Sequence, residues 1–146
     1  VEAVNRFETC IINTAAEAID YIARVDSPNI GVLLDTYHMN IEETSFAKAI
    51  EAVGPERLKS FHTGENSRTA PGRGHINWDE IFSSLAKIGY RGPIVSEPFV
   101  MQGGEVGRDI HVFRDLVENP CEAVIDAEAA YLLDFERNML KKYYAD

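Results

Sequence analysis

The chain has 146 residues, with 14 Lys or Arg against 24 Asp or Glu, and its formal net charge is −10. With 45% hydrophobic and 26% charged residues it has the composition of a globular domain, which argues against wholesale disorder. The acidic balance argues against nucleic-acid binding, and no apolar run approaches the roughly 20 residues of a membrane span.

Short apolar runs alternate with amphipathic segments along the chain. A continuous apolar run predicts a buried strand, and apolar residues spaced three or four apart predict an amphipathic helix. In chain order we expect a strand end at 2–7, a helix at 15–25, a strand at 30–34, a helix at 45–53, a strand at 58–62, a helix after Asn77 that ends at Gly89, a strand at 93–99, a helix around 109–117 and a long helix from Pro120 to Asp146.

Several boundaries carry local signals. Asn13 and Thr14 are suited to cap the first helix, and Asn77 with Glu80 three residues later resembles a capping box. The polar, glycine-containing segment 63–75 is too long for a simple connection, which indicates a functional loop.

The alternation of strands and helices predicts an α/β fold with a parallel sheet covered by helices. Four strand–helix units with an added C-terminal helix correspond to half of an eight-stranded (β/α) TIM barrel, which typically needs about 250 residues. A four-stranded flavodoxin-like sheet is the competing architecture. In either case residues 1–146 form a single domain.

Four polar residues close or follow the four predicted strands: Glu2, Asp35, His62 and Glu97. In a parallel barrel these positions converge on one face, where barrel enzymes hold their chemistry. Three carboxylates and an imidazole brought together would repel unless a cation lay among them. Mostly oxygen ligands with one nitrogen suit Mn²⁺, Mg²⁺ or Co²⁺ better than a structural zinc. Any one of these carboxylates could merely cap the next helix. Capping explains less easily why all four polar residues occur at the same place relative to their strands.

Three further residues lie in the loops just beyond candidate ligands, namely Glu8, His38 and Arg68. Each is within reach of a molecule bound to the metal, although each alone could be a solvated side chain. Other polar and aromatic residues do not occur at comparable positions after the predicted strands. We interpret them as structural, surface or inert: His75, His111, Trp78, Cys10 and Cys121.

Several segments, including VEAVNRFE, LLDTYHMNIEE and FHTGENSRTAPGRGHINWDEI, resemble the C-terminal half of the ketose 3-epimerases. This is the D-tagatose and D-psicose 3-epimerase group of the xylose-isomerase-like barrel superfamily. The resemblance covers essentially the whole chain. Tyr37 replaces a more usual Phe, and Cys10 stands where His is common, which bears on substrate preference and leaves the type of reaction unchanged.

The resemblance implies a divalent metal, Mn²⁺ first and otherwise Co²⁺ or Mg²⁺, on the four strand-end residues. It also implies that Glu2 and Glu97 form the acid/base pair, and that Glu8, His38 and Arg68 hold a ketose. Epimerisation at C3 moves hydrogen as a proton, so no organic cofactor is expected. The alternatives are another isomerase of the superfamily, such as a hydroxypyruvate isomerase or an inosose dehydratase, and a metal-binding half barrel without activity.

The sequence also supports expectations about the extent of the chain, its oligomeric state, its cellular compartment and its partners. A half barrel exposes sheet edges, so the chain is a piece of a longer polypeptide, a proteolysed remnant, or a half that self-association completes, and we favour the truncated chain. For the protein as a whole we expect a homo-oligomer, a dimer or a tetramer. The two cysteines form no disulfide framework, which suggests a reducing compartment, the cytoplasm. We expect no nucleic-acid or membrane partner.

Overall fold

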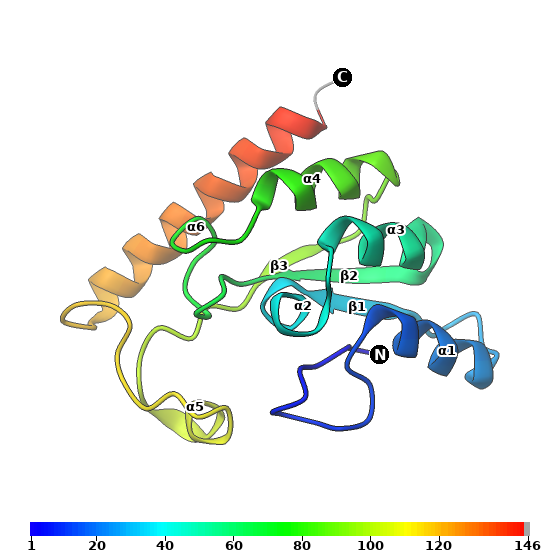
Figure 1. The fold of residues 1–146 in the computed structure, drawn as a ribbon. Coiled ribbons are helices and arrows are strands. Elements are labelled where there is room, and N and C mark those ends of the chain that lie inside the picture. Colours follow the sequence, from blue (N-terminus) through cyan, green and yellow to red (C-terminus); the bar gives the residue numbers. More distant parts are fainter. Residues whose placement is uncertain (145–146) are drawn as a thin grey trace.

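A computed structural model describes residues 1–144, and it shows a short parallel sheet with a layer of helices along its outer side (Figure 1). Helices α1, α3, α4 and α6 follow one another along that side, each in contact with the next. The elements are α1 (Ala15–Val25), β1 (Val32–Asp35), α2 (Thr36–Glu42), α3 (Phe46–Arg57), β2 (Leu58–Thr63), α4 (Trp78–Lys87), β3 (Ile94–Ser96), α5 (Gly104–Asp109) and α6 (Glu122–Tyr143).

The strands lie side by side in the order of the sequence. Strand β2 pairs in parallel with β1 and with β3, and Glu2 joins the outer side of β1 through a single parallel bridge to Leu33. Consecutive parallel strands that are also spatial neighbours are the arrangement of a (β/α) barrel, whereas a flavodoxin-like sheet interleaves its strands. The partial barrel is therefore the observed architecture.

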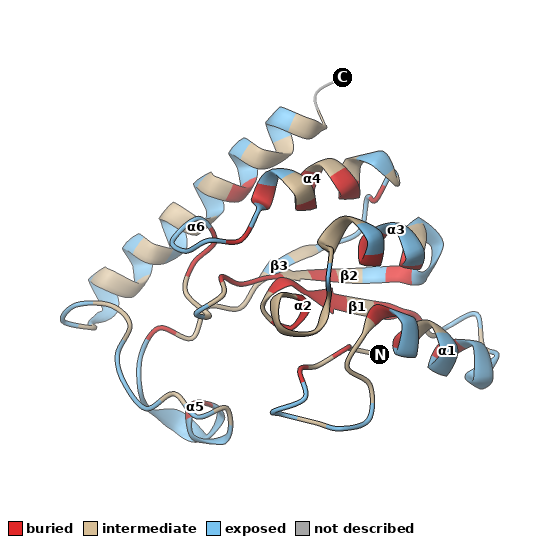
Figure 2. Ribbon diagram, in the orientation of Figure 1, coloured by how far each residue is buried: buried red, intermediate tan, exposed pale blue. Residues whose placement is uncertain are grey.

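The register decides which side chains share a face. Asp35 pairs with His62, and Leu34 with Phe61, so polar and apolar side chains of the two strands are in phase. Because side chains alternate along a strand, Leu34 and Phe61 point toward the helices while Asp35 and His62 point to the opposite face. Buried residues lie along the strands and on the sides of the helices that face them (Figure 2). The largest buried side chains of this core include Phe61, Phe82, Leu34, Ile50, Ile81 and Leu85.

The first predicted strand, 2–7, is reduced to the bridge at Glu2. The chain leaves the sheet directly afterwards, because Val4 donates its amide to Ile12 O and Glu8 donates its amide to Asn5 O, which turns the segment back on itself. The strand predicted at 93–99 is also shorter, covering Ile94–Ser96. Pro98 has no amide hydrogen to continue the ladder.

The prediction of a helix around 109–117 is wrong. The helix α5 occupies Gly104–Asp109 instead, and His111 follows with a φ of 62°, a left-handed conformation that ends it. Beyond it Phe113 is 80% exposed, so this segment does not present a buried helical face.

Two helices depart from the prediction. No sequence pattern indicates α2, which begins directly after β1 and is capped by Asp35, whose carboxylate accepts from the amide of Tyr37. Helix α3 continues past the expected stop, although Gly54 interrupts it with φ 70° and ψ 168°. The last helix runs as expected up to Tyr143, and positions 145 and 146 lie outside the described residues. Among helices within residues 1–144, none has the length and apolar character needed to cross a bilayer.

Candidate metal centre and active site

The carboxyl ends of the three strands bring Asp35, His62 and Glu97 together. Each offers a ligand atom within 4.8 Å of the other two, and Nδ1 of His62 is 3.4 Å from Oε1 of Glu97 and 4.0 Å from Oδ2 of Asp35. Glu97 follows β3 directly, and its amide donates to Thr63 O, which continues the pairing with β2 by one residue. The parallel register alone is therefore sufficient to assemble these groups.

His62 Nδ1 is buried and has no hydrogen-bond partner, even though two carboxylates lie close by. A buried imidazole nitrogen without a partner is costly, since the large majority of such atoms are satisfied. A divalent cation between this nitrogen and the two carboxylates would satisfy all three groups. The donor set thus fits a metal ion of the Mn²⁺, Co²⁺ or Mg²⁺ type.

A second group shares Asp35 with the first. Glu2, Asp35 and His38 also offer ligand atoms within 4.8 Å of one another, with His38 Nε2 3.7 Å from Glu2 Oε1. Asp35 thereby joins Glu2 on one side to His62 and Glu97 on the other. His38, which the sequence placed near the substrate, lies beside the expected ligands as well.

The electrostatics of these side chains indicate a site built for positive charge. Burial, together with the nearby carboxylates of Asp35 and Glu97, raises the pKa of Glu2 above its ordinary value. Burial likewise raises the pKa of Asp35, in spite of the neighbouring His38 and Arg68. The pKa of His38 is lowered, chiefly by burial, which favours its neutral form. Acids whose charged forms are disfavoured, beside neutral imidazole, are what a bound cation would stabilise.

Four side chains form a network next to the cluster. The buried Asn5 lies with Nδ2 3.0 Å from Glu8 Oε1 and 2.8 Å from His38 Nδ1. Arg68 contacts the same two residues, at 3.2 Å from Glu8 Oε1 and 3.2 Å from His38 Nε2. The three predicted flanking residues are thus brought together, and with them Asn5, whose only signal in the sequence is its proximity to Glu8.

Aromatic rings hold the guanidinium of Arg68. Its Cζ lies 4.3 Å from the ring centroid of Tyr37 and 5.2 Å from that of Phe99. A planar guanidinium stacks on such rings and keeps its N–H groups free for polar partners. Tyr37 also meets His38 edge-on, so the position where this chain has Tyr is in direct contact with two site residues.

The loop that carries Arg68 is organised by Glu65, which is fully buried. Its carboxylate accepts hydrogen bonds from four N–H groups, those of Trp78 Nε1 and of the amides of Asn66, Gly72 and Ile76. Carboxylates satisfied by several N–H donors are stable when buried. Trp78 is therefore a core residue with a structural hydrogen bond, as expected.

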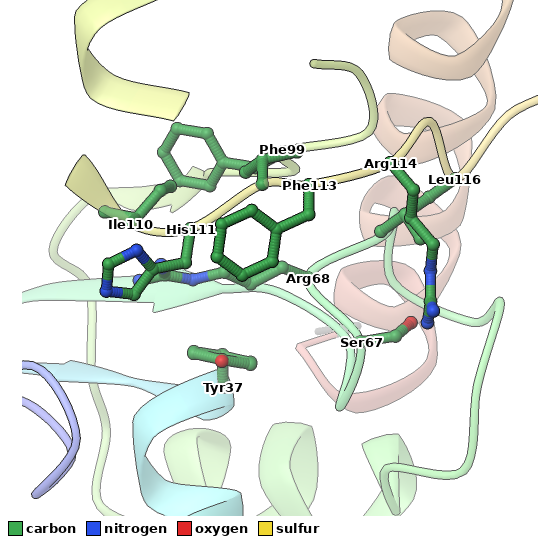
Figure 3. Close-up of a pocket in the computed structure, with 10 residues that line it drawn as sticks. Tyr37, Ser67, Arg68, Phe99, Ile110, His111, Phe113, Arg114 and Leu116 are labelled. Atoms are coloured by element: carbon green, nitrogen blue, oxygen red, sulfur yellow. The ribbon is translucent and has the colours of Figure 1, made fainter. Parts of the chain in front are cut away.

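A cavity of about 350 Å³ adjoins the network, with Arg68 in its wall (Figure 3). Tyr37 lines it from the start of α2 and Phe99 from the segment after β3, while His111 and Phe113 come from the segment after α5. His75 and His111 are both exposed, and His111 differs from the structural or surface role expected of it in that it lines this cavity. Cys10 and Cys121 are exposed free thiols.

Residues 1–130 match the family model described as xylose isomerase-like TIM barrel. The chain belongs to this family. The match agrees with the sequential parallel order of the strands and excludes the flavodoxin-like alternative.

Several relatives are sugar epimerases by name. The chain is 50% identical over 141 residues to the D-psicose 3-epimerase of Ruminiclostridium cellulolyticum and 46% identical over 140 residues to that of Agrobacterium fabrum. These alignments cover 97% and 96% of this chain and 48% of each relative. A crystal structure of D-psicose 3-epimerase with D-tagatose from Clostridium cellulolyticum H10 superposes with a TM-score of 0.92 at 50% identity, covering 96% of this chain and 48% of that one.

The chain therefore spans about half the length of the curated relatives it matches. The resemblance to the ketose 3-epimerases is confirmed, as is the partial barrel of strand–helix units.

Proposed function

We propose that the protein epimerises a ketose at C3 with the help of a divalent metal. The observation that carries the proposal is the cluster of Asp35, His62 and Glu97, with the buried His62 Nδ1 left without a hydrogen-bond partner beside two carboxylates. The names of the relatives support the reaction class, because D-psicose 3-epimerases match nearly the whole of this chain.

The metal-binding residues in this proposal are Glu2, Asp35, His62 and Glu97, and Mn²⁺ is the expected ion, with Co²⁺ or Mg²⁺ as alternatives. When bound, the ion supplies Lewis acidity that makes the hydrogen on C3, next to the C2 carbonyl, easier to remove as a proton.

Glu2 and Glu97 act on that proton. They come from opposite ends of the row of strand ends, Glu2 beside β1 and Glu97 after β3, which allows them to approach C3 from two sides. One carboxylate accepts the proton, and the other, in its protonated form, returns a proton to the opposite face and inverts the carbon. Burial and the neighbouring carboxylates raise the pKa of Glu2, which is the direction that a general acid requires.

Glu8, His38 and Arg68 bind the sugar in this proposal. Their polar atoms already meet at 3.2 Å between Arg68 and each of the other two, so they present a connected array of donors and acceptors beside the metal ligands. The stacking of Arg68 on Tyr37 fixes its position before the sugar arrives, which lowers the entropy lost on binding.

We further propose that the whole protein binds a free ketohexose, acts in the cytoplasm and assembles as a dimer or tetramer. An isomerase of hydroxypyruvate or an inosose dehydratase is less well supported, because the relatives named above are ketose epimerases.

The experiment that tests the proposal follows the C3 hydrogen. The protein is incubated with Mn²⁺ and D-fructose, D-tagatose or D-psicose in deuterated water, and exchange at C3 is measured by NMR together with the C3 epimer formed. We expect exchange and epimer with the parent chain and neither with Glu97→Gln, while Glu105→Gln on the exposed α5 serves as the control. Exchange by Glu97→Gln at the parent rate would remove Glu97 from the acid/base pair, and no product from the parent chain would favour a half barrel without activity.

A further inference from the structure

Helix α6 buries one carboxylate against the sheet. Glu136 is 8% exposed and is the buried residue of this helix, whose other described residues are exposed or half-buried. The helix lies beside α4 at the end of the row of helices (Figures 1 and 2). Burying a carboxylate is costly unless hydrogen bonds compensate for the lost water, so its partners matter.

The partners of Glu136 are two hydroxyl groups on neighbouring strands. Its Oε1 accepts hydrogen bonds from Thr63 Oγ1 and from Ser96 Oγ, the latter at 2.7 Å, and the two hydroxyl oxygens also touch each other. Each hydroxyl has one proton to donate, and the carboxylate oxygen has the lone pairs to accept from both. We call this arrangement of Glu136, Thr63 and Ser96 the strand clasp.

The strand clasp lies on the opposite face of the sheet from the candidate metal ligands. Thr63 and Ser96 are partners across β2 and β3, and each is next in sequence to a ligand, Thr63 after His62 and Ser96 before Glu97. Because side chains alternate along a strand, the two hydroxyls point to the helix side while His62 and Glu97 point to the site. One carboxylate thereby ties together the two main-chain segments from which His62 and Glu97 project.

We propose that Glu136 is a positioning residue for the metal centre, and that the strand clasp sets the spacing between His62 and Glu97. This inference rests on the function proposed above. The distance of 3.4 Å between His62 Nδ1 and Glu97 Oε1 leaves little tolerance, since two ligands of one ion must keep a fixed separation. Besides the clasp, main-chain hydrogen bonds join the two segments at the end of the short strand β3, where the amide of Glu97 donates to Thr63 O.

The test compares Mn²⁺ affinity, measured by calorimetry on the purified protein, with thermal stability in the absence of metal. We expect Glu136→Leu, which removes the acceptor, to weaken Mn²⁺ binding about tenfold or more, in the range typical for partners that orient metal ligands. Glu136→Gln keeps an acceptor oxygen for both hydroxyls and should bind within about twofold of the parent, since the clasp needs an acceptor and no charge. Asp134→Leu, at an exposed position of the same helix, is the matched control.

Different outcomes separate the alternatives. A merely structural role predicts a lower melting temperature for Glu136→Leu with unchanged Mn²⁺ affinity of the folded protein, and that result would overturn the proposal. If Glu136→Gln and Glu136→Leu lose Mn²⁺ affinity equally, the hydrogen bonds of the clasp are not the cause of the loss, and the proposal is wrong. If Glu136→Leu does not fold, Thr63→Val and Ser96→Ala decide, because each removes one hydroxyl, and parent-like affinity in both contradicts the inference. Failure of the parent chain itself to bind Mn²⁺ would instead refute the proposed metal centre.

Discussion

Asp35 and His62 are paired across β1 and β2, and Oδ2 of the aspartate lies 4.0 Å from Nδ1 of the histidine. The same aspartate accepts a hydrogen bond from the amide of Tyr37 through Oδ1 and so begins α2. One oxygen of the carboxylate therefore has a structural role, and the other faces the cluster. Helix capping and metal binding, which the sequence presented as alternatives, are both compatible with Asp35.

The central role of His62 gives a direct prediction. His62→Ala removes the only nitrogen of the Asp35, His62 and Glu97 group, so Mn²⁺ affinity should fall by more than the roughly 10- to 100-fold that the loss of an orienting partner typically costs. Calorimetric titration with Mn²⁺ measures the change. His75→Ala is the control, since His75 is exposed and outside the cluster, and an affinity of His62→Ala equal to the parent's would show that the ligand set is wrong.

Glu65 offers a prediction about the loop that carries Arg68. In Glu65→Gln an amide NH₂ replaces one of the two oxygens, each of which accepts from two N–H groups, so buried donors lose their acceptor. At about 1–3 kcal/mol for each unsatisfied buried group, the free energy of unfolding should fall by at least about 2 kcal/mol in urea titrations. Glu118→Gln, at an exposed position, should change it by less than about 0.5 kcal/mol. Equal stability of the two variants would show that the amide is accommodated.

The N-terminus of α1 predicts a dependence on pH. Hydrogen bonds from the amides of Asn13 and Thr14 and from the Thr14 hydroxyl lower the pKa of Glu17 below its ordinary value of 4.5. A lowered pKa in the folded state means that ionised Glu17 adds stability above the unfolded-state pKa, and that this stability is lost as the pH falls through the folded-state pKa.

Glu17→Gln should therefore be less stable than the parent at pH 7, and the difference should shrink as the pH is lowered below about 4.5. Urea unfolding across this range measures it, with Glu56→Gln as an exposed carboxylate for comparison. A difference that stays constant from pH 7 to pH 3 would mean that the charge of Glu17 contributes nothing to the capping box.

The elements that the sequence predicted well are those with signals inside the element. The helix expected at 15–25 has the bounds of α1, because Thr14 and Glu17 form a capping box within the segment itself. Asn77 likewise accepts from the amide of Glu80 at the start of α4. The carboxylate of Glu80, however, accepts from Ser45 Oγ and the amide of Ala47, a contact between helices that no local pattern could indicate.

The candidate site was predictable to the extent that strand ends are. The spacing of about one strand–helix unit predicts Asp35, His62 and Glu97 at the ends of adjacent parallel strands. The register of the strands then places the three side chains on the same face of the sheet. Asn5 and Glu136 were missed because their roles depend on residues 33 to 73 positions away in the chain. The segment after Asp109 misled the prediction for the opposite reason, since its apolar residues face solvent or the cavity instead of a core.

Strand β3 hydrogen-bonds to a neighbour along one side only within the described part of the chain. Its outer main-chain N–H and C=O groups must be satisfied by water or by another extended segment, and Val95 beside them is 40% exposed. An edge strand of this kind can pair with a strand of another molecule, so self-association of this polypeptide should rise with its concentration and reverse on dilution.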